Sequence, residues 1–195
     1  MTEFVSTFMM ENPHPGYLAQ WPAMPKDLND IAAWLTENKS KTILEFGTWE
    51  GYTTLMMSKL PDVEKITTVD IYDGFDVAYG HCYHGLRNKE FYGSFIKDVK
   101  NVEQVFCDTT KFKTKEKYDA VFIDANHSYE SVKNDTKVCL QVNPKIIIWH
   151  DYISEQGVSD YINELKSKGV KIVHGNALAC YTKVDEHFLE VVNGQ

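Results

Sequence analysis

The chain has 195 residues, 43% hydrophobic and 13% aromatic, which is enough to build one domain with a substantial core. Its formal net charge is −8 and its lysines are scattered among acids, which argues against a nucleic-acid partner. No apolar run approaches the roughly 18 residues of a membrane span and Met1-Thr2-Glu3 lacks the basic region of a secretory signal, so we expect a cytoplasmic protein with no membrane partner.

The first 26 residues are predicted to form an irregular arm packed on the domain. They combine four prolines, which break regular structure, with four large aromatic residues that are costly to leave in water. These aromatics can pack on their own domain or on a second subunit, so a homo-oligomer is left open. The domain itself is expected over residues 27–195, with a first helix over 28–38 and Asp27 as its N-cap.

Short β-like runs then alternate with helical patterns. Strands are predicted over 42–46, 65–71, 102–107, 118–124, 145–150, 170–174 and 177–184, and helices over 52–60, 88–99, 128–142 and 155–168. The alternation predicts the α/β class: a single Rossmann-like domain with a mostly parallel seven-stranded sheet and helices on both faces. The connection over 72–87 is unusually long, so we interpret it as a functional loop or a small insertion.

The turn after the first strand has the composition of a ligand-binding turn, because residues 45–54 read E-F-G-T-W-E-G-Y-T-T. Gly47 and Gly51 let the backbone turn sharply and approach a ligand. The second strand ends in Asp70, roughly 20 residues later, where an acid can accept hydrogen bonds from ribose hydroxyls. Each feature alone is compatible with a plain tight turn, but their order and spacing favour cofactor binding. A nicotinamide dinucleotide is disfavoured, because Thr48 and Trp49 would crowd its pyrophosphate.

These residues resemble motif I of the S-adenosylmethionine (SAM)-dependent methyltransferases, in the form E-x-G-T-x-x-G-Y-[ST]-T of macrocin-type O-methyltransferases and relatives of catechol O-methyltransferase. By motif order the resemblance extends over residues 42–184. It implies that SAM is the cofactor, that Glu45 and Gly47 lie beside its methionine part, and that Asp70 holds its ribose. The same resemblance assigns further cofactor positions to Thr48, Gly51, Thr53 and Asp108, the last of these near adenine.

Acids and histidines follow the fourth and fifth predicted strands, where residues 121–130 read V-F-I-D-A-N-H-S-Y-E and residues 146–152 read I-I-I-W-H-D-Y. Neighbouring parallel strands open into one crevice at their carboxyl ends, and packing explains charged groups there poorly. Asp124, His150 and Asp151 are therefore predicted to gather on one divalent cation. Oxygen ligands suit Mg²⁺, Ca²⁺ or Mn²⁺, whereas a histidine ligand tilts the choice toward Mn²⁺, Fe²⁺ or Zn²⁺, and Mg²⁺ or Mn²⁺ is the expected ion.

The family resemblance implies a similar site. Residues 124–130 resemble the D-G-x-H-x-Y-E motif of macrocin-type enzymes, with Asp124 at a metal-ligand position and His127 at the position of the proposed general base. Asp151 matches the second acid of their D-D-Y motif, whereas His150 replaces the first. We predict that Asp124 and Asp151 hold the metal, His127 takes a proton, and His150 either ligates or supports the ligands. The alternative is that His150 is structural and the residues around His127 only cap a helix.

The leading prediction is a SAM-dependent methyltransferase that acts on a hydroxyl of a small molecule or glycan with help from a metal. A bound cation lowers the pKa of the hydroxyl, and a neutral histidine can accept its proton. Two alternatives stay open: a metal-independent N- or C-methyltransferase, whose activity would resist a chelator, and a SAM-binding protein without turnover. The arm and the 72–87 segment are expected to select the acceptor, and deletion of 79–85 to abolish transfer while sparing SAM affinity.

Overall fold

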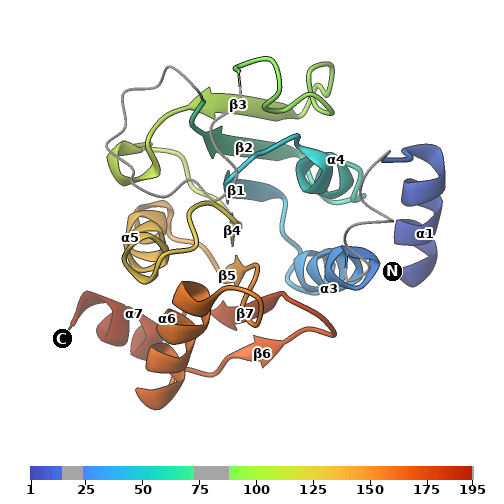
Figure 1. Ribbon diagram of the computed structural model, residues 1–195. Coiled ribbons are helices and arrows are strands. Elements are labelled where there is room, and N and C mark those ends of the chain that lie inside the picture. The colour runs from blue at the N-terminus through green and yellow to red at the C-terminus, as the bar shows by residue number, and fades with distance from the viewer. Residues whose placement is uncertain (15–23, 73–87, 195) are drawn as a thin grey trace.

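The computed structural model describes residues 1–14, 24–72 and 88–194, whose strands form one sheet in the order β3-β2-β1-β4-β5-β7-β6 (Figure 1). The strands are β1 (Thr42–Phe46), β2 (Lys65–Asp70), β3 (Val102–Phe106), β4 (Ala120–Ile123), β5 (Ile146–Trp149), β6 (Val173–His174) and β7 (Cys180–Lys183). Neighbouring strands from β3 to β5 are parallel, and β7 runs antiparallel to both β5 and β6. The strand order reverses between β1 and β4, which is where open α/β sheets bind ligands.

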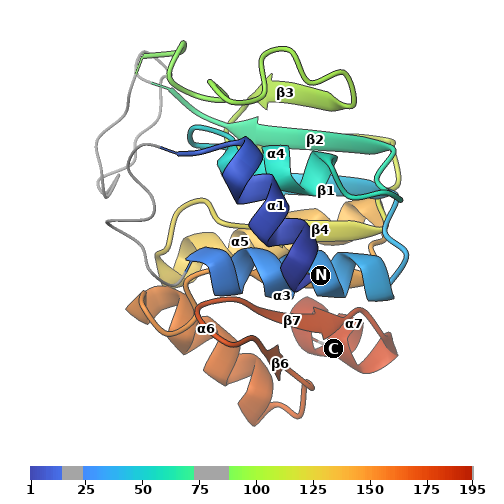
Figure 2. The ribbon, with the colours of Figure 1, turned by 90° about the vertical axis from the view of Figure 1, so that its right-hand side faces the viewer.

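Helices cover both faces of the sheet (Figures 1 and 2). One face carries α1 (Thr2–Glu11), α3 (Met24–Glu37) and α4 (Tyr52–Ser58), and the other carries α5 (Tyr129–Cys139), α6 (Gln156–Ser167) and α7 (Glu186–Asn193). Two 3₁₀ turns complete the order, η1 (Thr109–Lys111) and η2 (Leu140–Val142). The predicted α/β fold, with its mostly parallel seven-stranded sheet, is therefore confirmed.

Strand β5 shows how the sequence places this sheet in the core. Ile146 and Ile148 pack into the hydrophobic cluster on the α3 side, whereas Ile147 and Trp149 pack into the cluster on the α5 and α6 side. All four side chains are fully buried, as expected for a strand covered on both faces. Among the described residues, none of the helices is long and apolar enough to cross a membrane.

The prediction of an irregular N-terminal arm is wrong for Thr2–Glu11, which form α1. Val5 and Phe8 lie one helical turn apart and are buried, and the Phe8 ring packs 5.3 Å from that of Tyr52. The four prolines all lie after this helix, so they do not interrupt it. Residues 15–23 lie outside the described part of the chain.

Helix α3 begins at Met24, four residues before the predicted start, and its Pro25 occupies the first turn, where a missing N–H costs nothing. Asp27 is therefore not the N-cap. It lies inside the helix with 2% of its surface exposed, and its Oδ1 accepts hydrogen bonds from the backbone N–H groups of Leu178 and Ala179.

The predicted helix over residues 88–99 is wrong, because residues 89–98 form successive turns. Gly93 has a φ of +69°, and its N–H donates to the carbonyl of Trp49 at 2.7 Å rather than within a helix. Phe95 N–H donates in the same way to Glu50 at 3.0 Å. The segment is thus a support for the glycine turn after β1. The predicted loop role of residues 72–87 falls almost wholly on residues 73–87, which lie outside the described residues.

Candidate active site at the carboxyl ends of the strands

The glycine turn after β1 touches the end of β4. Gly47 has a φ of +97°, and a Cβ on it would lie 2.0 Å from the carbonyl oxygen of Asp124. Gly51, with a φ of +83°, is the N-cap of α4. The turn therefore depends on glycine both for its backbone conformation and for its close approach to β4. At Gly47, the predicted cofactor site adjoins the end of β4, where the predicted cation site begins.

The carboxylate of Asp70 binds the backbone of this turn. Its Oδ2 accepts hydrogen bonds from the N–H groups of Thr48 and Trp49 at 2.7 and 2.8 Å, and its Oδ1 accepts one from Ile71 at 2.7 Å. Burial raises the pKa of Asp70 to about 6, against these three hydrogen bonds, which lower it. Each carboxylate oxygen has two lone pairs, so Oδ2 is filled by its two N–H partners, whereas Oδ1 can accept one further hydrogen bond. A ribose contact at Asp70 stays a prediction.

Glu45 lies underneath the turn rather than in the open crevice. Its side chain is buried, with 1% of the residue exposed, and Oε2 accepts a hydrogen bond from the hydroxyl of Thr54 at 2.5 Å. Burial raises the pKa of Glu45 to about 8, so the protonated form is favoured at neutral pH. The residue is thus placed to brace β1 against α4, and a direct contact with the methionine part of SAM stays a prediction.

The remaining predicted cofactor residues occupy different environments. Thr48 is buried and its hydroxyl shares a 2.6 Å hydrogen bond with Thr68. Thr53 lies half-buried in the first turn of α4. Asp108 caps η1, because its Oδ1 accepts hydrogen bonds from the N–H and hydroxyl of Thr110 at 2.9 and 2.7 Å. An adenine contact at Asp108 therefore has to coexist with this capping role.

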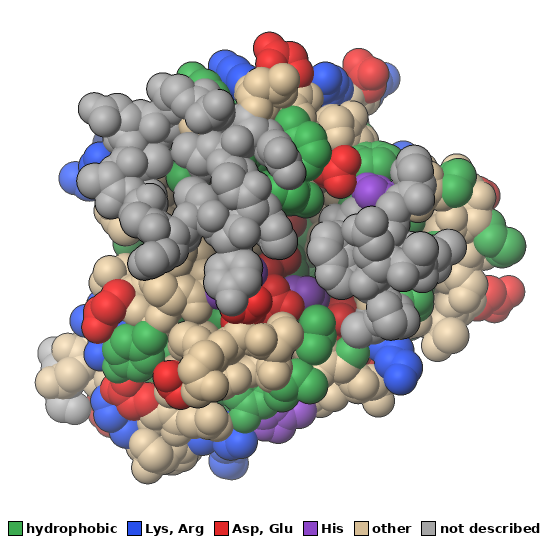
Figure 3. Space-filling model, in the orientation of Figure 1, with side chains coloured by type: hydrophobic (Ala, Val, Ile, Leu, Met, Phe, Trp, Pro, Cys, Tyr) green, Lys and Arg blue, Asp and Glu red, His purple; other side chains and the backbone are tan. Residues whose placement is uncertain are grey.

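Acidic and histidine side chains gather in a hollow at the end of β4 and β5 (Figure 3). Asp124, His127 and Asp151 offer ligand atoms that all lie within 4.8 Å of one another. His127 Nε2 lies 3.4 Å from Asp124 Oδ1 and 3.3 Å from Asp151 Oδ2. These separations fit three donors around one cation, because oxygen and nitrogen ligands of first-row metals lie about 2.0–2.2 Å from the ion.

Backbone geometry fixes the two acids of this cluster. Asp124 N–H donates to Phe46 at 2.8 Å, which holds the end of β4 against β1. Asp151 has a φ of +58°, a strained conformation for a residue with a side chain, and its Oδ1 accepts a hydrogen bond from Ser154 at 2.8 Å. Strain of this kind is common at functional sites, where surrounding contacts maintain it.

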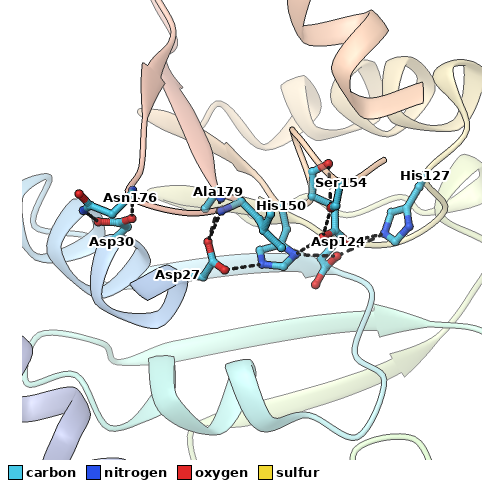
Figure 4. Close-up of polar contacts among 10 residues, drawn as sticks. Asp27, Asp30, Asp124, His127, His150, Ser154, Asn176 and Ala179 are labelled. Carbon is cyan, nitrogen blue, oxygen red and sulfur yellow. Dashed lines mark hydrogen bonds and ion pairs between the residues drawn. The ribbon is translucent and has the colours of Figure 1, made fainter. Parts of the chain in front are cut away.

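His150 lies on the other side of the two acids (Figure 4). Its Nδ1 is 3.6 Å from Asp124 Oδ1 and 3.3 Å from Asp151 Oδ1, and its Nε2 is 3.6 Å from Asp27 Oδ2. Of the four predicted cluster residues, Asp124, His127 and Asp151 thus face one point, and His150 faces the same acids from behind. Asp27 was missed as a site residue, because only the packing of α3 brings it there.

The charges in this cluster are strongly coupled. Burial alone would raise the pKa of Asp124, but His150 and His127 overcome it and lower that pKa well below its usual value. Burial likewise works to lower the pKa of both histidines, whereas Asp124 raises the pKa of each of them. Without a cation, the acids therefore favour the charged form of both histidines. A divalent cation would supply positive charge to the same acids and so lower the pKa of the histidines.

A cavity of about 450 Å³ lies along the β6–β7 connection. It is lined by Tyr152, Ile153, His174, Gly175, Asn176, Ala177 and Ala179. The rings of Tyr152 and His174 pack 4.8 Å apart, and Ile153 is 66% exposed. Tyr152 in its lining is the residue that follows Asp151 in the chain. Its mixture of aromatic, apolar and amide groups suits a small organic molecule.

Comparisons with known protein families identify the family of this chain. The sequence model of a family described as a methyltransferase domain matches residues 44–152, which span more than half of the chain and contain the glycine turn and both acids. A search of curated protein sequences found no match.

Solved methyltransferases share the fold. An O-methyltransferase from Bacillus cereus in complex with S-adenosylhomocysteine (SAH) is 15% identical, with a TM-score of 0.59 over 94% of this chain and 90% of that one. The O-methyltransferase TomG from Streptomyces achromogenes, in complex with SAM, is 15% identical, with a TM-score of 0.58 over 94% and 89%. A TDP-rhamnose 3′-O-methyltransferase of calicheamicin biosynthesis is 14% identical, with a TM-score of 0.57 over 95% and 93%. At these identities the likeness establishes the fold.

Proposed function

Because the chain belongs to the methyltransferase-domain family, we propose that it transfers a methyl group from SAM to a hydroxyl of a small molecule or glycan, assisted by a divalent cation. One observation carries the proposal: the glycine turn and the acid cluster meet at Gly47 and Asp124, whose atoms leave no room for a Cβ between them. A cofactor on the turn would therefore present its methyl group beside the cluster. The O-methyltransferases of similar fold support a hydroxyl acceptor.

The turn residues fit SAM. Gly47 brings the turn against the backbone of Asp124, and Asp70 holds the N–H groups of the turn in one orientation. We assign Glu45 and Gly47 to the methionine side, Asp70 to the ribose and Asp108 to the adenine. SAM supplies a methyl sulfonium, so the protein has to position the acceptor oxygen in line with it and help to remove one proton.

The acid cluster fits a divalent cation, since Asp124, His127 and Asp151 converge within 4.8 Å. Asp124 and Asp151 would hold the ion, with Mg²⁺ or Mn²⁺ favoured by two carboxylates. A cation there would bind the acceptor hydroxyl and lower its pKa. His127 is then the base, and it takes the proton at Nε2. Because Nε2 is also the atom that would bind the cation, His127 can act either as the base or as a ligand, but not as both at once. His150 is a ligand or a support.

The cavity along Tyr152 and His174 supports the choice of acceptor class. Its aromatic side chains would suit the stacking of an aromatic or sugar ring. The acid-rich, net negative chain favours such a small acceptor over a polyanion. We also propose a cytoplasmic location for the protein.

Chelation is expected to stop catalysis. The assay follows SAH released from SAM with panels of catechols, phenols and nucleotide sugars, in EDTA and after re-addition of Mg²⁺ or Mn²⁺. Turnover should fall by at least about a hundredfold in EDTA and return with metal. Loss of Lewis-acid stabilisation of the transition state raises the activation free energy by several kcal/mol. Turnover that resists EDTA would overturn the cation's role and favour an N- or C-methyltransferase, and SAM binding without turnover on any acceptor would favour a non-catalytic binding protein.

A further inference from the structure

A carboxylate from helix α3 reaches the back of the acid cluster. The Asp27 side chain is only 3% exposed. Its Oδ1 accepts hydrogen bonds from the N–H groups of Leu178 and Ala179 at 2.7 and 3.0 Å. Its Oδ2 is buried without a hydrogen-bond partner among the described residues, and it faces His150 Nε2 at 3.6 Å. A buried carboxylate oxygen left without a partner is costly unless it has a charged or donor group to face.

The His150 ring spans the space between Asp27 and the cluster (Figure 4). While Nε2 faces Asp27, Nδ1 faces Asp124 and Asp151 at 3.6 and 3.3 Å, and Nδ1 is buried without a hydrogen-bond partner among the described residues. The group that one ring nitrogen of a histidine contacts determines what the other nitrogen can do. Asp27 is placed to face a protonated Nε2 with its carboxylate oxygen, and this orients the ring with Nδ1 toward the two acids.

We propose that Asp27 is a positioning residue for the cation site and acts through His150. The inference rests on the proposed function, because it requires a cation at Asp124 and Asp151. A carboxylate behind a histidine orients the ring and raises its basicity in many metal sites. This arrangement holds whether His150 Nδ1 ligates the ion or supports the two carboxylates from behind. It makes the cation site depend on α3, an element that precedes the strands in the chain.

Asparagine cannot replace Asp27 in this role. Both backbone N–H groups and His150 Nε2 need an acceptor, and the amide of asparagine has only one oxygen. If that oxygen stays with Leu178 and Ala179, an NH₂ group opposes Nε2 and disfavours its proton. The ring then turns, or its proton moves to Nδ1, and a protonated Nδ1 cannot ligate a cation. The shape of the side chain is nevertheless unchanged, so the fold should tolerate the substitution.

Asp30 provides a matched control on the same helix. Its carboxylate accepts hydrogen bonds from the N–H and side-chain amide of Asn176, the latter at 2.6 Å, so it also ties α3 to the β6–β7 connection. Figure 4 shows it pointing away from His150. Asp30→Asn therefore weakens a similar helix-to-loop contact without touching the cluster. A general loss of α3 packing would affect both variants alike.

The experiment measures Mn²⁺ dissociation constants by electron paramagnetic resonance of the free ion, with the melting temperature and the SAH affinity of each variant as checks on folding. Asp27→Asn should weaken Mn²⁺ binding by about 10–100-fold, and Asp30→Asn by less than about 2-fold. His150→Asn should show a loss similar to that of Asp27→Asn. In the His150→Asn background, Asp27→Asn should change the affinity by less than about 2-fold, because the residue it acts through is already gone.

Each other outcome overturns the inference in an identifiable way. Unchanged Mn²⁺ affinity in Asp27→Asn rejects the role of Asp27 and leaves the proposed function intact. Equal losses in Asp27→Asn and Asp30→Asn, or additive losses in the double variant, assign the effect to α3 packing. If the unsubstituted protein binds no Mn²⁺ while it binds SAH, the cation site of the proposed function fails, and the inference fails with it.

Discussion

Asp124→Asn is expected to reduce methyl transfer on the order of a thousandfold and to abolish Mn²⁺ binding in the micromolar range. The substitution keeps the side-chain shape but removes a negative charge that faces both His127 and His150. It thus removes a ligand and about 4 kcal/mol of stabilisation, the equivalent of a thousandfold change in rate. The pKa values of the two histidines should also fall, because Asp124 raises both of them. The measurement is SAH release under saturating metal, together with Mn²⁺ titration.

A matched substitution separates this effect from a general loss of acidity. Asp160→Asn removes an exposed carboxylate of α6 whose contact is with the neighbouring Gln156 side chain. It should leave transfer and Mn²⁺ affinity within about 2-fold of the original values, as for most surface substitutions. Retention of more than a tenth of the transfer rate in Asp124→Asn would remove this residue from the catalytic account.

Gly47→Ala is expected to destabilise the protein by about 3–5 kcal/mol and to eliminate SAM binding. The new Cβ would lie 2.0 Å from the carbonyl oxygen of Asp124 and 2.5 Å from its carbonyl carbon, and backbone atoms cannot move aside as a flexible side chain can. A φ of +97° adds strain for any residue with a Cβ. Losses of this size are confined to a few mechanisms, backbone strain among them. Urea unfolding and SAH calorimetry measure the two effects.

Gly51→Ala is the comparison for this prediction. Gly51 also has a positive φ, +83°, but its Cβ would lie 3.1 Å from a side-chain carbon of Ile96 and 3.3 Å from the Cα of Gly93. These contacts need shifts of only a few tenths of an ångström, so the conformational strain of about 1–2 kcal/mol should dominate. A Gly51→Ala variant that is as unstable as Gly47→Ala would mean that the close approach of β1 to β4 is not the decisive contact.

Local patterns were sufficient to predict the sheet. Strands β4 and β5 are short apolar runs between polar turns, as expected for strands buried on both faces. Helix α1 escaped prediction because prolines nearby in sequence dominated the interpretation, although they lie outside its span. The turns over residues 89–98 escaped it for another reason: the apolar spacing is helical, but Gly93 and Phe95 bond to the glycine turn instead. These tertiary hydrogen bonds replace helical ones, and the local sequence gives no sign of them.

The candidate site was partly predictable for the same reason. Asp124 follows β4 directly and Asp151 follows β5 after His150, so a parallel sheet had to bring them to one edge. The partners of these residues were not predictable. Asp27 reaches His150 only because α3 packs beside β7, across more than a hundred residues of sequence. The backbone N–H groups that occupy Asp70 depend on the exact path of the glycine turn.

Calorimetric titration with SAM and SAH tests the central claim most directly. It is performed in EDTA and then with Mg²⁺ or Mn²⁺, with Asp70→Ala as the control because that carboxylate holds the glycine turn. The account predicts that the unsubstituted protein binds both ligands and that Asp70→Ala loses this binding. Failure of both ligands to bind under every metal condition would contradict the proposed methyltransferase function and leave only the α/β fold.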